Sequence, residues 1–317
     1  MNDLAQRLTV VLLTHNCAAW LPATLDRLAD LGLPVVAVDN ASTDGTRELL
    51  AQRPFVRVRA LASNIGAAGR NEGVRAVTTP YVAFCDDDGW WERDGLERAV
   101  RLLDAHPRLA LVNARIVVGD TGRLDPISAE MASSPLPETD GVPGTVLHSF
   151  MGGAAVMRAA AYEQVGGYHP AFFIGGEEET LAWPLLKAGW LLRYRDDVVM
   201  HHHPSKANFS GLRAFGVRNT LWNSWLHRPL GSALRWTVFI VRSSPWNRDL
   251  VHGLVLTLRG LPWVLRRRAT VTPELDAGLR QLEERRFAAW REARRAGLRA
   301  GTASPYPVED APLGNGA

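Results

Sequence analysis

Residues 81–88 have the sequence YVAFCDDD, an apolar run that ends in three adjacent aspartates. The run is typical of a buried strand, and the aspartates begin where that strand would end. Three neighbouring carboxylates repel one another, whereas a turn or a helix cap needs only one of them. Since a hard divalent cation offsets such a cluster, the triplet favours a Mg²⁺ or Mn²⁺ site shared with substrate phosphates over a solvated acidic turn.

Strands and helices alternate on both sides of this stretch. Strands are predicted over 8–13, 34–38, 56–61, 81–85 and 109–118, and helices over 20–31, 46–52, 70–77 and 96–105. Short connections between such elements indicate parallel strands. We therefore expect an α/β fold, with a Rossmann-like, mostly parallel sheet sandwiched by helices. Residues 119–148, rich in Gly, Pro, Ser and Asp, are expected to form a long loop.

Polar residues follow each of the first four predicted strands. They are Thr14 and Asn16, then Asp39, Asn40 and Ser42, then Asn64 and Gly66, and finally the aspartate triplet. A single cluster of this kind is explained by a turn or a helix cap. Four clusters at successive strand ends instead predict one acidic, hydrogen-bonding crevice, because such sheets bind ligands at the carboxyl ends of their strands.

Several motifs, in their order and spacing, resemble the family 2 glycosyltransferases of GT-A fold, including bacterial rhamnosyltransferase-like members. The motifs are VVLLTHN (10–16), VDNASTDGT (38–46), NIGAAGRN (64–71), FCDDD (84–88), GGA (152–154), GGY (166–168) and GEEE (176–179). The resemblance covers roughly residues 8–205. It implies that a sugar passes from a nucleotide-diphosphate sugar donor to an acceptor hydroxyl, with inversion at the anomeric carbon. The acceptor implied is a glycan or a lipid-linked molecule of cell-envelope or polysaccharide synthesis.

The resemblance also implies roles for particular residues. Donor-binding positions are Thr14, Asn16 and Asp39 for the nucleotide base, with Asn40, Asn64, Arg70, Asp86 and Asp87 beside them. Asp86 and Asp88 match the Asp-x-Asp motif, in which the first carboxylate lies toward the ribose and the second holds the metal on the diphosphate. A metal placed there would stabilise the charge that a diphosphate leaving group gains.

Two further clusters match functional positions of the family. Glu177, Glu178 and Glu179 lie where the family places its catalytic base, usually in a Glu-Asp pair, so this sequence departs from the pattern. We favour Glu178 over Glu177 as the base, and Glu179 is better explained as a charge that complements a helix dipole. One histidine of residues 201–203 is expected to contact metal or phosphate, with His203 preferred to His202.

Composition excludes several classes of protein. Hydrophobic residues make up 46% of the 317 residues and charged residues 22%, which is typical of a soluble globular protein. The two cysteines lie far apart, so we expect neither a disulfide framework nor a zinc site. We expect neither a secretory signal nor a membrane-spanning helix, since the first residues lack a basic region and no apolar run reaches 18 residues. The expected location is the cytoplasm, at the inner face of the membrane.

Charge is distributed unevenly along the chain. Residues 201–270 carry eleven Lys or Arg and one acid, interleaved with Trp, Leu and Val, whereas the first 200 residues are net acidic. We therefore divide the chain into a catalytic domain (1–205), a basic Trp/Arg-rich helical segment (206–270), and a charged exposed helix with a disordered tail (271–317). Basic faces with aromatic anchors favour peripheral contact with an anionic membrane.

Other interpretations of these features stay open. The basic segment is alternatively a helical subdomain whose arginines face solvent or another protomer of a homo-oligomer, while nucleic acid is disfavoured because no recognition motif is present. A sugar-phosphate nucleotidyltransferase would need a Gly-rich, basic loop after the first strand, and residues 14–18 (THNCA) do not form one. The alternative function that involves no catalysis is that of a nucleotide-sugar-binding scaffold at the membrane surface. Loss of either carboxylate cluster would favour it, and both are present.

Overall fold

The computed structural model describes residues 3–119, 122–204 and 212–296. The chain divides into two compact units, Met1–Asn208 and Phe209–Ala317, each with a hydrophobic core of its own. The start of the predicted basic segment and the predicted disordered tail lie in residues 205–211 and 297–317, outside the described residues.

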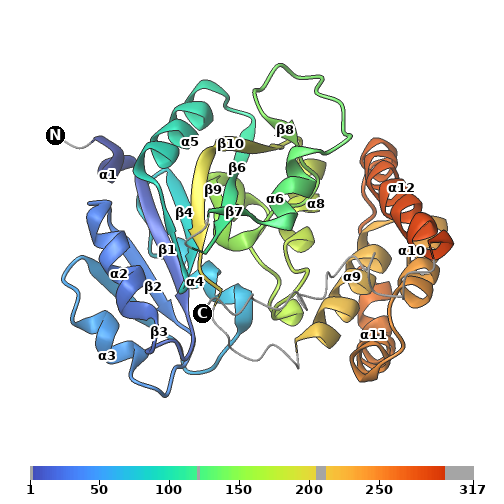
Figure 1. The fold of residues 1–317 in the computed structure, drawn as a ribbon, viewed down its shortest axis with the longest axis horizontal. Coiled ribbons are helices and arrows are strands. Elements are labelled where there is room, and N and C mark those ends of the chain that lie inside the picture. Colours follow the sequence, from blue (N-terminus) through green and yellow to red (C-terminus); the bar gives the residue numbers. More distant parts are fainter. Residues whose placement is uncertain (1–2, 120–121, 205–211, 297–317) are drawn as a thin grey trace. The chain divides into compact units, whose positions relative to one another are not determined.

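The first unit is built on one ten-stranded sheet with the order β3-β2-β1-β4-β9-β6-β10-β5, in which β7 pairs with β6 and β8 with β10 (Figure 1). The strands are β1 (Leu8–Thr14), β2 (Val35–Asp39), β3 (Val56–Ala60), β4 (Tyr81–Asp86), β5 (Gly89–Trp91), β6 (Leu109–Val118), β7 (Arg123–Leu124), β8 (Thr145–Val146), β9 (Ala155–Arg158) and β10 (Leu191–His202). Strands β3, β2, β1 and β4 are parallel neighbours, as are β6 and β10, whereas β9 runs antiparallel between β4 and β6. The predicted α/β fold is confirmed, and its longest strand pairings are parallel.

Helices cover both faces of this sheet. They are α1 (Asp3–Arg7), α2 (Leu21–Asp30), α3 (Thr46–Ala51), α4 (Gly69–Arg75), α5 (Arg93–Ala105), α6 (Pro126–Ala132), α7 (Ala159–Gln164) and α8 (Glu179–Lys187), with short 3₁₀ turns η1 (Gly66–Ala68), η2 (Gly152–Ala154) and η3 (Pro170–Phe172). Val10 and Leu12 of β1 share a core with Leu25 of α2. Val11 lies on the other face, against Gly73 of α4. Alternate side chains of one strand thus serve two layers of helices.

Residues 119–148 contain more regular structure than the expected long loop. Between them lie β7, α6 and β8. The side chain of Asp125 caps α6 by accepting a hydrogen bond from the backbone N–H of Ile127 (2.8 Å), and Pro126 occupies the first helical position. An Asp-Pro pair starts a helix as readily as it makes a turn. The short helix was not predicted because the Gly and Ser residues around it are typical of a loop.

The second unit consists of four helices in its described part. They are α9 (Arg213–His227), α10 (Leu230–Ser243), α11 (Arg248–Arg266) and α12 (Pro273–Arg295). Their core contains Leu221, Trp236, Phe239 and Ile240, and Phe287 of α12 packs against it. The predicted charged helix is therefore less exposed than expected, because it contributes an aromatic residue to this core.

Buried charge also ties α12 into the second unit. Arg228 is 2% exposed and forms ion pairs with Asp276 (2.9 Å) and Glu283, both on α12. Ser232 donates a further hydrogen bond to Asp276 (2.9 Å). The acids that made α12 look solvent-exposed in the sequence thus neutralise an arginine inside the unit. Within the ranges that the structure describes, none of the helices is long and apolar enough to cross a bilayer.

Two glycines in the first unit provide a matched test of packing. Gly45 and Gly66 both have positive φ, +91° and +63°. A Cβ at Gly66 would lie 2.1 Å from the carbonyl oxygen of Phe173, whereas nothing lies within 4 Å of one at Gly45. Gly45→Ala should cost about 1 kcal/mol of unfolding free energy for its backbone conformation, and Gly66→Ala about 3 kcal/mol because overpacking is added. Urea unfolding measures both, and equal losses would contradict the contact.

Candidate active site

The ends of three parallel strands bring polar residues together at one edge of the sheet. Thr14, the last residue of β1, pairs in register with Asp39, the last residue of β2. On its other side β1 pairs with β4, where Leu13 is opposite Asp86. The predicted crevice-forming residues therefore lie at neighbouring positions along one edge, as expected for a ligand site in such a sheet.

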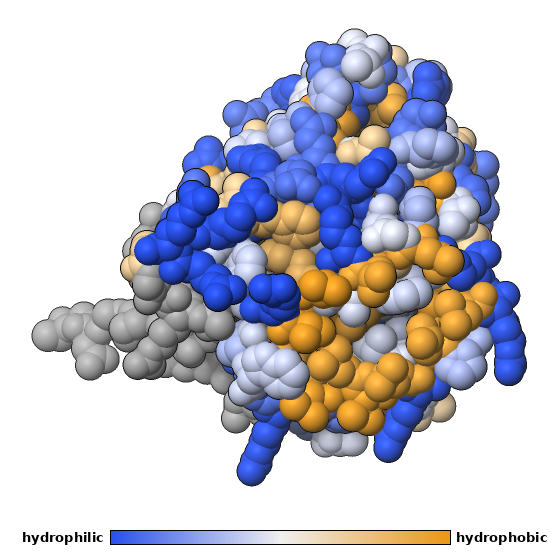
Figure 2. All heavy atoms as spheres, turned by 90° about the vertical axis from the view of Figure 1, so that its right-hand side faces the viewer, coloured by the Kyte–Doolittle hydropathy of each residue, from blue (hydrophilic) through white to orange (hydrophobic). Residues whose placement is uncertain are grey.

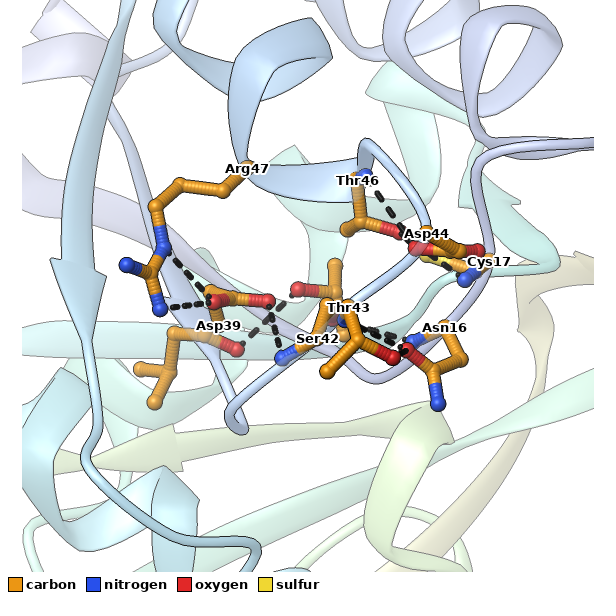
Figure 3. A network of polar contacts seen from close by, with 10 residues as sticks. Asn16, Cys17, Asp39, Ser42, Thr43, Asp44, Thr46 and Arg47 are labelled. Atoms are coloured by element: carbon orange, nitrogen blue, oxygen red, sulfur yellow. Dashed lines mark hydrogen bonds and ion pairs between the residues drawn. The ribbon is translucent and has the colours of Figure 1, made fainter.

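The loops that follow β1 and β2 are fastened to each other (Figure 3). Asn16 has a φ of +50°, and its backbone N–H donates to the hydroxyl of Ser42 (2.9 Å). Its side-chain oxygen accepts from the backbone N–H of Thr43 (2.8 Å). Asp44 accepts from the backbone N–H of Ala18 (3.0 Å) and from the Thr46 hydroxyl (2.6 Å). These contacts fix the shape of the edge before any ligand binds.

Asp39 lies beneath these loops and is completely buried. Its carboxylate accepts two hydrogen bonds from the Arg47 guanidinium, both 3.1 Å, and a longer one from the backbone N–H of Ser42 (3.3 Å). The hydroxyl of Thr14 donates to the carbonyl of Val38 (3.2 Å). Arg47, in the first turn of α3, was not among the predicted site residues, because nothing in the residue types marks it.

Asn40 and Asn64 shape the neighbouring loop. The Asn40 amide donates to the carbonyl of Gly66 (2.9 Å), and its oxygen accepts from the backbone N–H of Ile65 (3.1 Å). Asn64 accepts from the backbone N–H of Gly66 (2.9 Å). Both side chains thus hold the turn that precedes Arg70.

The three aspartates at the end of β4 have three different sets of partners. Asp86 forms an ion pair with Arg70 (2.5 Å). Asp87 accepts a hydrogen bond from the Trp20 indole (3.2 Å), and burial together with the Asp88 charge raises the pKa of Asp87 to about 7. The Asp88 carboxylate lies 3.5 Å from Nε2 of His202. The three carboxylates thus face a buried arginine, the tryptophan that precedes helix α2, and a histidine.

The histidine run is likewise divided among different partners. His202 faces Asp88, and although burial lowers the pKa of His202, the hydrogen bond and charge of Asp88 raise it overall. His201 pairs with Glu92 (3.0 Å). His203, the preferred metal ligand from the sequence, packs its ring against Trp90 with a centroid distance of 4.6 Å and donates its backbone N–H to the carbonyl of Asp88 (2.8 Å). The ring of His202 thus faces an aspartate of the triplet.

The donor set at Asp88 fits a divalent cation that is shared with a substrate. In the described parts of the chain no three His, Cys, Asp or Glu side chains form a group that could hold a metal. Asp86, the other metal ligand expected from the sequence, has one carboxylate oxygen on Arg70. Asp88 and His202 instead offer one oxygen and one nitrogen ligand. Mg²⁺ commonly takes one or two carboxylates and completes its shell with substrate phosphates and water, so two protein ligands suffice.

One short turn connects the two carboxylate clusters of the sequence. The backbone N–H of Gly152 in η2 donates to Glu178 (3.3 Å). A Cβ on the next residue, Gly153, would lie 2.2 Å from a carboxylate oxygen of Asp86. Consequently Asp86 and Glu178 contact adjacent residues of η2, and Gly153 is required to be a glycine for Asp86 to lie where it does.

Arg70 is the positive charge of this cluster. It is 5% exposed, and its guanidinium lies 5.6 Å from the ring centroid of Tyr168. Burial raises the pKa of both Glu177 and Glu178, and the Arg70 charge opposes that rise. Arg70 Nε, one oxygen of Glu177 and the Tyr168 hydroxyl are buried without a hydrogen-bond partner. Burial therefore favours the protonated form of these glutamates, and the cluster offers unpartnered polar atoms to a ligand.

Comparison with known proteins identifies the family. Residues 9–166 match Glycosyl transferase family 2. A pre-mycofactocin glycosyltransferase of Mycobacterium tuberculosis is 31% identical over 201 residues, which cover 61% of this chain and 42% of the relative. A putative teichuronic acid biosynthesis glycosyltransferase of Bacillus subtilis, TuaG, is 32% identical over 111 residues, which cover 32% of this chain and 44% of the relative. Each match thus spans less than half of the relative's length.

Solved structures show the same fold. Mannosyltransferase PcManGT from Pyrobaculum calidifontis has a TM-score of 0.55 at 21% identity, covering 92% of this chain and 79% of that one. Residues 1–349 of S. aureus TarS have a TM-score of 0.59 at 15% identity, covering 95% and 99%. The sequence motifs, the sheet and these likenesses agree: the chain belongs to glycosyl transferase family 2 and has a GT-A fold.

Proposed function

We propose that this chain transfers a sugar from a nucleotide-diphosphate sugar to an acceptor hydroxyl, with inversion and with the help of Mg²⁺ or Mn²⁺. The observation that carries the proposal is the meeting of Asp86 and Glu178 at η2. A donor-side carboxylate cluster and a base are thereby held by one turn of backbone. Inverting transfer needs these two functions on opposite sides of the reacting carbon.

Glu178 is the proposed base. A base for this reaction removes the acceptor proton as the hydroxyl attacks, and it works best when its pKa lies near the working pH. Burial raises the pKa of Glu178, and the Gly152 amide orients the carboxylate. Glu177 is the alternative, since one of its oxygens is buried without a partner.

Asp88 and His202 are the proposed metal ligands. The bound cation would neutralise charge that develops on the diphosphate leaving group. Arg70 holds Asp86 beside this position through an ion pair. PcManGT, of similar fold, is known in complex with GDP-Man and Mn²⁺, and TarS in complex with UDP-GlcNAc, which supports the class of donor and of cation.

The nucleotide base is proposed to lie over the ends of β1 and β2, beside Thr14, Asn16 and Asp39. The acceptor is proposed to be a glycan or a lipid-linked precursor of one. Relatives named for such pathways support this class: TuaG, and the succinoglycan biosynthesis protein ExoO of Rhizobium meliloti, which is 32% identical over 142 residues covering 43% of this chain.

The role of Glu178 is tested by changing each glutamate of the cluster to glutamine. Glu178→Gln should lower transfer by roughly 10²–10⁴-fold with unchanged donor affinity, because only proton removal is lost. Glu179→Gln is the matched control, since Glu179 accepts from Ser149 (3.3 Å) and should keep nearly full activity.

The donor for this assay is first found by screening nucleotide sugars for thermal stabilisation in Mn²⁺. Initial transfer rates then separate the variants. A crippled Glu177→Gln with a nearly normal Glu178→Gln would reassign the base. If the wild type binds a donor but neither transfers its sugar nor hydrolyses it, the catalytically silent scaffold would be favoured.

The metal assignment is tested by a pair of neighbouring aspartates. Asp88→Asn should weaken Mn²⁺-dependent binding of UDP or GDP by at least about 30-fold, because it removes a charged metal ligand. Asp87→Asn should weaken it clearly less, since the amide oxygen can still accept from Trp20 and no metal ligand is lost. Calorimetry with and without Mn²⁺ measures both. Equal effects of the two changes, or undiminished metal dependence in Asp88→Asn, would refute the assignment.

A further inference from the structure

The second unit exposes apolar side chains that its core does not use. Among the described residues, the exposed large hydrophobic side chains all lie between positions 230 and 265. They are Leu230, Leu234, Val238, Trp246, Val251, Val255, Leu258 and Leu265. Figure 2 shows apolar residues gathered on one part of this face, with hydrophilic side chains at its edges. Monomeric soluble proteins rarely expose such a contiguous patch unless it binds something.

The spacing places these residues on one side of each helix. On α10 they recur every fourth residue (230, 234 and 238), and on α11 at intervals of four, three and seven (251, 255, 258 and 265). These intervals are those of a single helical face. The opposite faces supply the core, with Phe239 and Ile240 from α10 and Leu250 from α11. Each helix thus has two apolar sides, of which one is covered by the unit itself.

Positive charge borders the exposed side of α11. Arg248, Arg259 and Arg266 are exposed and are separated by eleven and seven residues, so they share one flank of the apolar stripe. Asp249 is the single acid of α9, α10 and α11. The face therefore combines an apolar centre with charge of one sign.

The turn between α10 and α11 carries an aromatic anchor. Trp246 is 74% exposed, more than any other large apolar side chain of the patch. It lines a shallow hollow with Arg248, Val251 and His252. Tryptophan beside arginine is favoured where apolar chains meet charged headgroups.

We propose that the α10–α11 surface docks on the headgroup layer of an anionic lipid bilayer, with its apolar side chains at the acyl boundary and its arginines on lipid phosphates. Lipid fits better than a second copy of this chain. In a two-fold dimer the same patch would face itself, and the arginines of both copies would then approach each other. This docking does not depend on the proposed transfer reaction, because none of its residues belongs to the first unit.

Sedimentation of the full chain with vesicles tests the docking. At low salt the protein should sediment with phosphatidylglycerol vesicles and stay in solution with phosphatidylcholine vesicles. Binding should weaken steeply as salt rises toward 0.5 M, since the Debye length shortens. Equal sedimentation with both lipids, or with neither, would overturn the proposal.

Two double variants distinguish the charge of this surface from the net charge of the chain. Arg259→Gln with Arg266→Gln should weaken partitioning roughly 30-fold, at about fivefold for each arginine. The matched control changes two exposed arginines of the first unit, Arg101→Gln with Arg108→Gln, and should leave partitioning within about threefold. Loss of binding in both pairs alike would mean that net charge alone is responsible, and would overturn the assignment to this surface.

Trp246→Ser with Leu258→Ser should also weaken partitioning, by more than about tenfold, without altering the fold, since both side chains are exposed. Circular dichroism and thermal melting check the fold. Analytical ultracentrifugation of the same variant examines the rival occupant. The patch would be a protein interface if two results were found together. The wild type would be a dimer that does not sediment with anionic vesicles, and the double variant would be a monomer.

Discussion

The candidate active site depends on one buried positive charge. Arg70 forms an ion pair with Asp86 and lies close enough to Glu177 and Glu178 to oppose the rise in their pKa. Without it, the carboxylates of Asp86, Glu177 and Glu178, which come from two distant parts of the chain, would lack a positive charge to offset their repulsion. Asp88, two residues further on, faces His202 instead. The carboxylates at the end of β4 thus have different partners, one of which is an arginine of helix α4.

The location of the site could be predicted from the sequence more accurately than the contacts between its side chains. Strand periodicity and polar strand ends were sufficient to predict the sheet and its ligand-binding edge, since Thr14, Asp39 and Asp86 needed only parallel pairing to become neighbours. Which histidine faces Asp88 depends on the register of β10, and the pairing of β10 with β6 shifts between Arg195 and Val199. A one-residue shift turns every later side chain to the other face of a strand. Such an irregularity has no signature in the residue types alone.

The second unit shows the same limit for charge patterns. Residues 271–296 contain acids and arginines in similar numbers, which is typical of a solvated helix, yet Asp276 and Glu283 are buried against Arg228. Composition does not reveal which charges pair inside a fold. In contrast, the apolar residues interleaved with arginine on α10 and α11 were visible in the sequence, and the structure divides them into a core side and an exposed side. The sequence pattern therefore predicted apolar residues among the arginines. Which of these residues form the core could be seen only from their packing partners.

We expect Asp88 and His202 to hold the metal while Arg70 keeps its ion pair with Asp86. A crystal structure with Mn²⁺ and a nucleoside diphosphate, recorded at a wavelength where manganese scatters anomalously, tests this arrangement. One strong anomalous peak should lie within coordination distance of the Asp88 carboxylate and a His202 ring nitrogen, with the Arg70–Asp86 ion pair intact. A peak bound to Asp86, with Arg70 displaced from it, or a bound diphosphate whose metal touches neither Asp88 nor His202, would refute the arrangement.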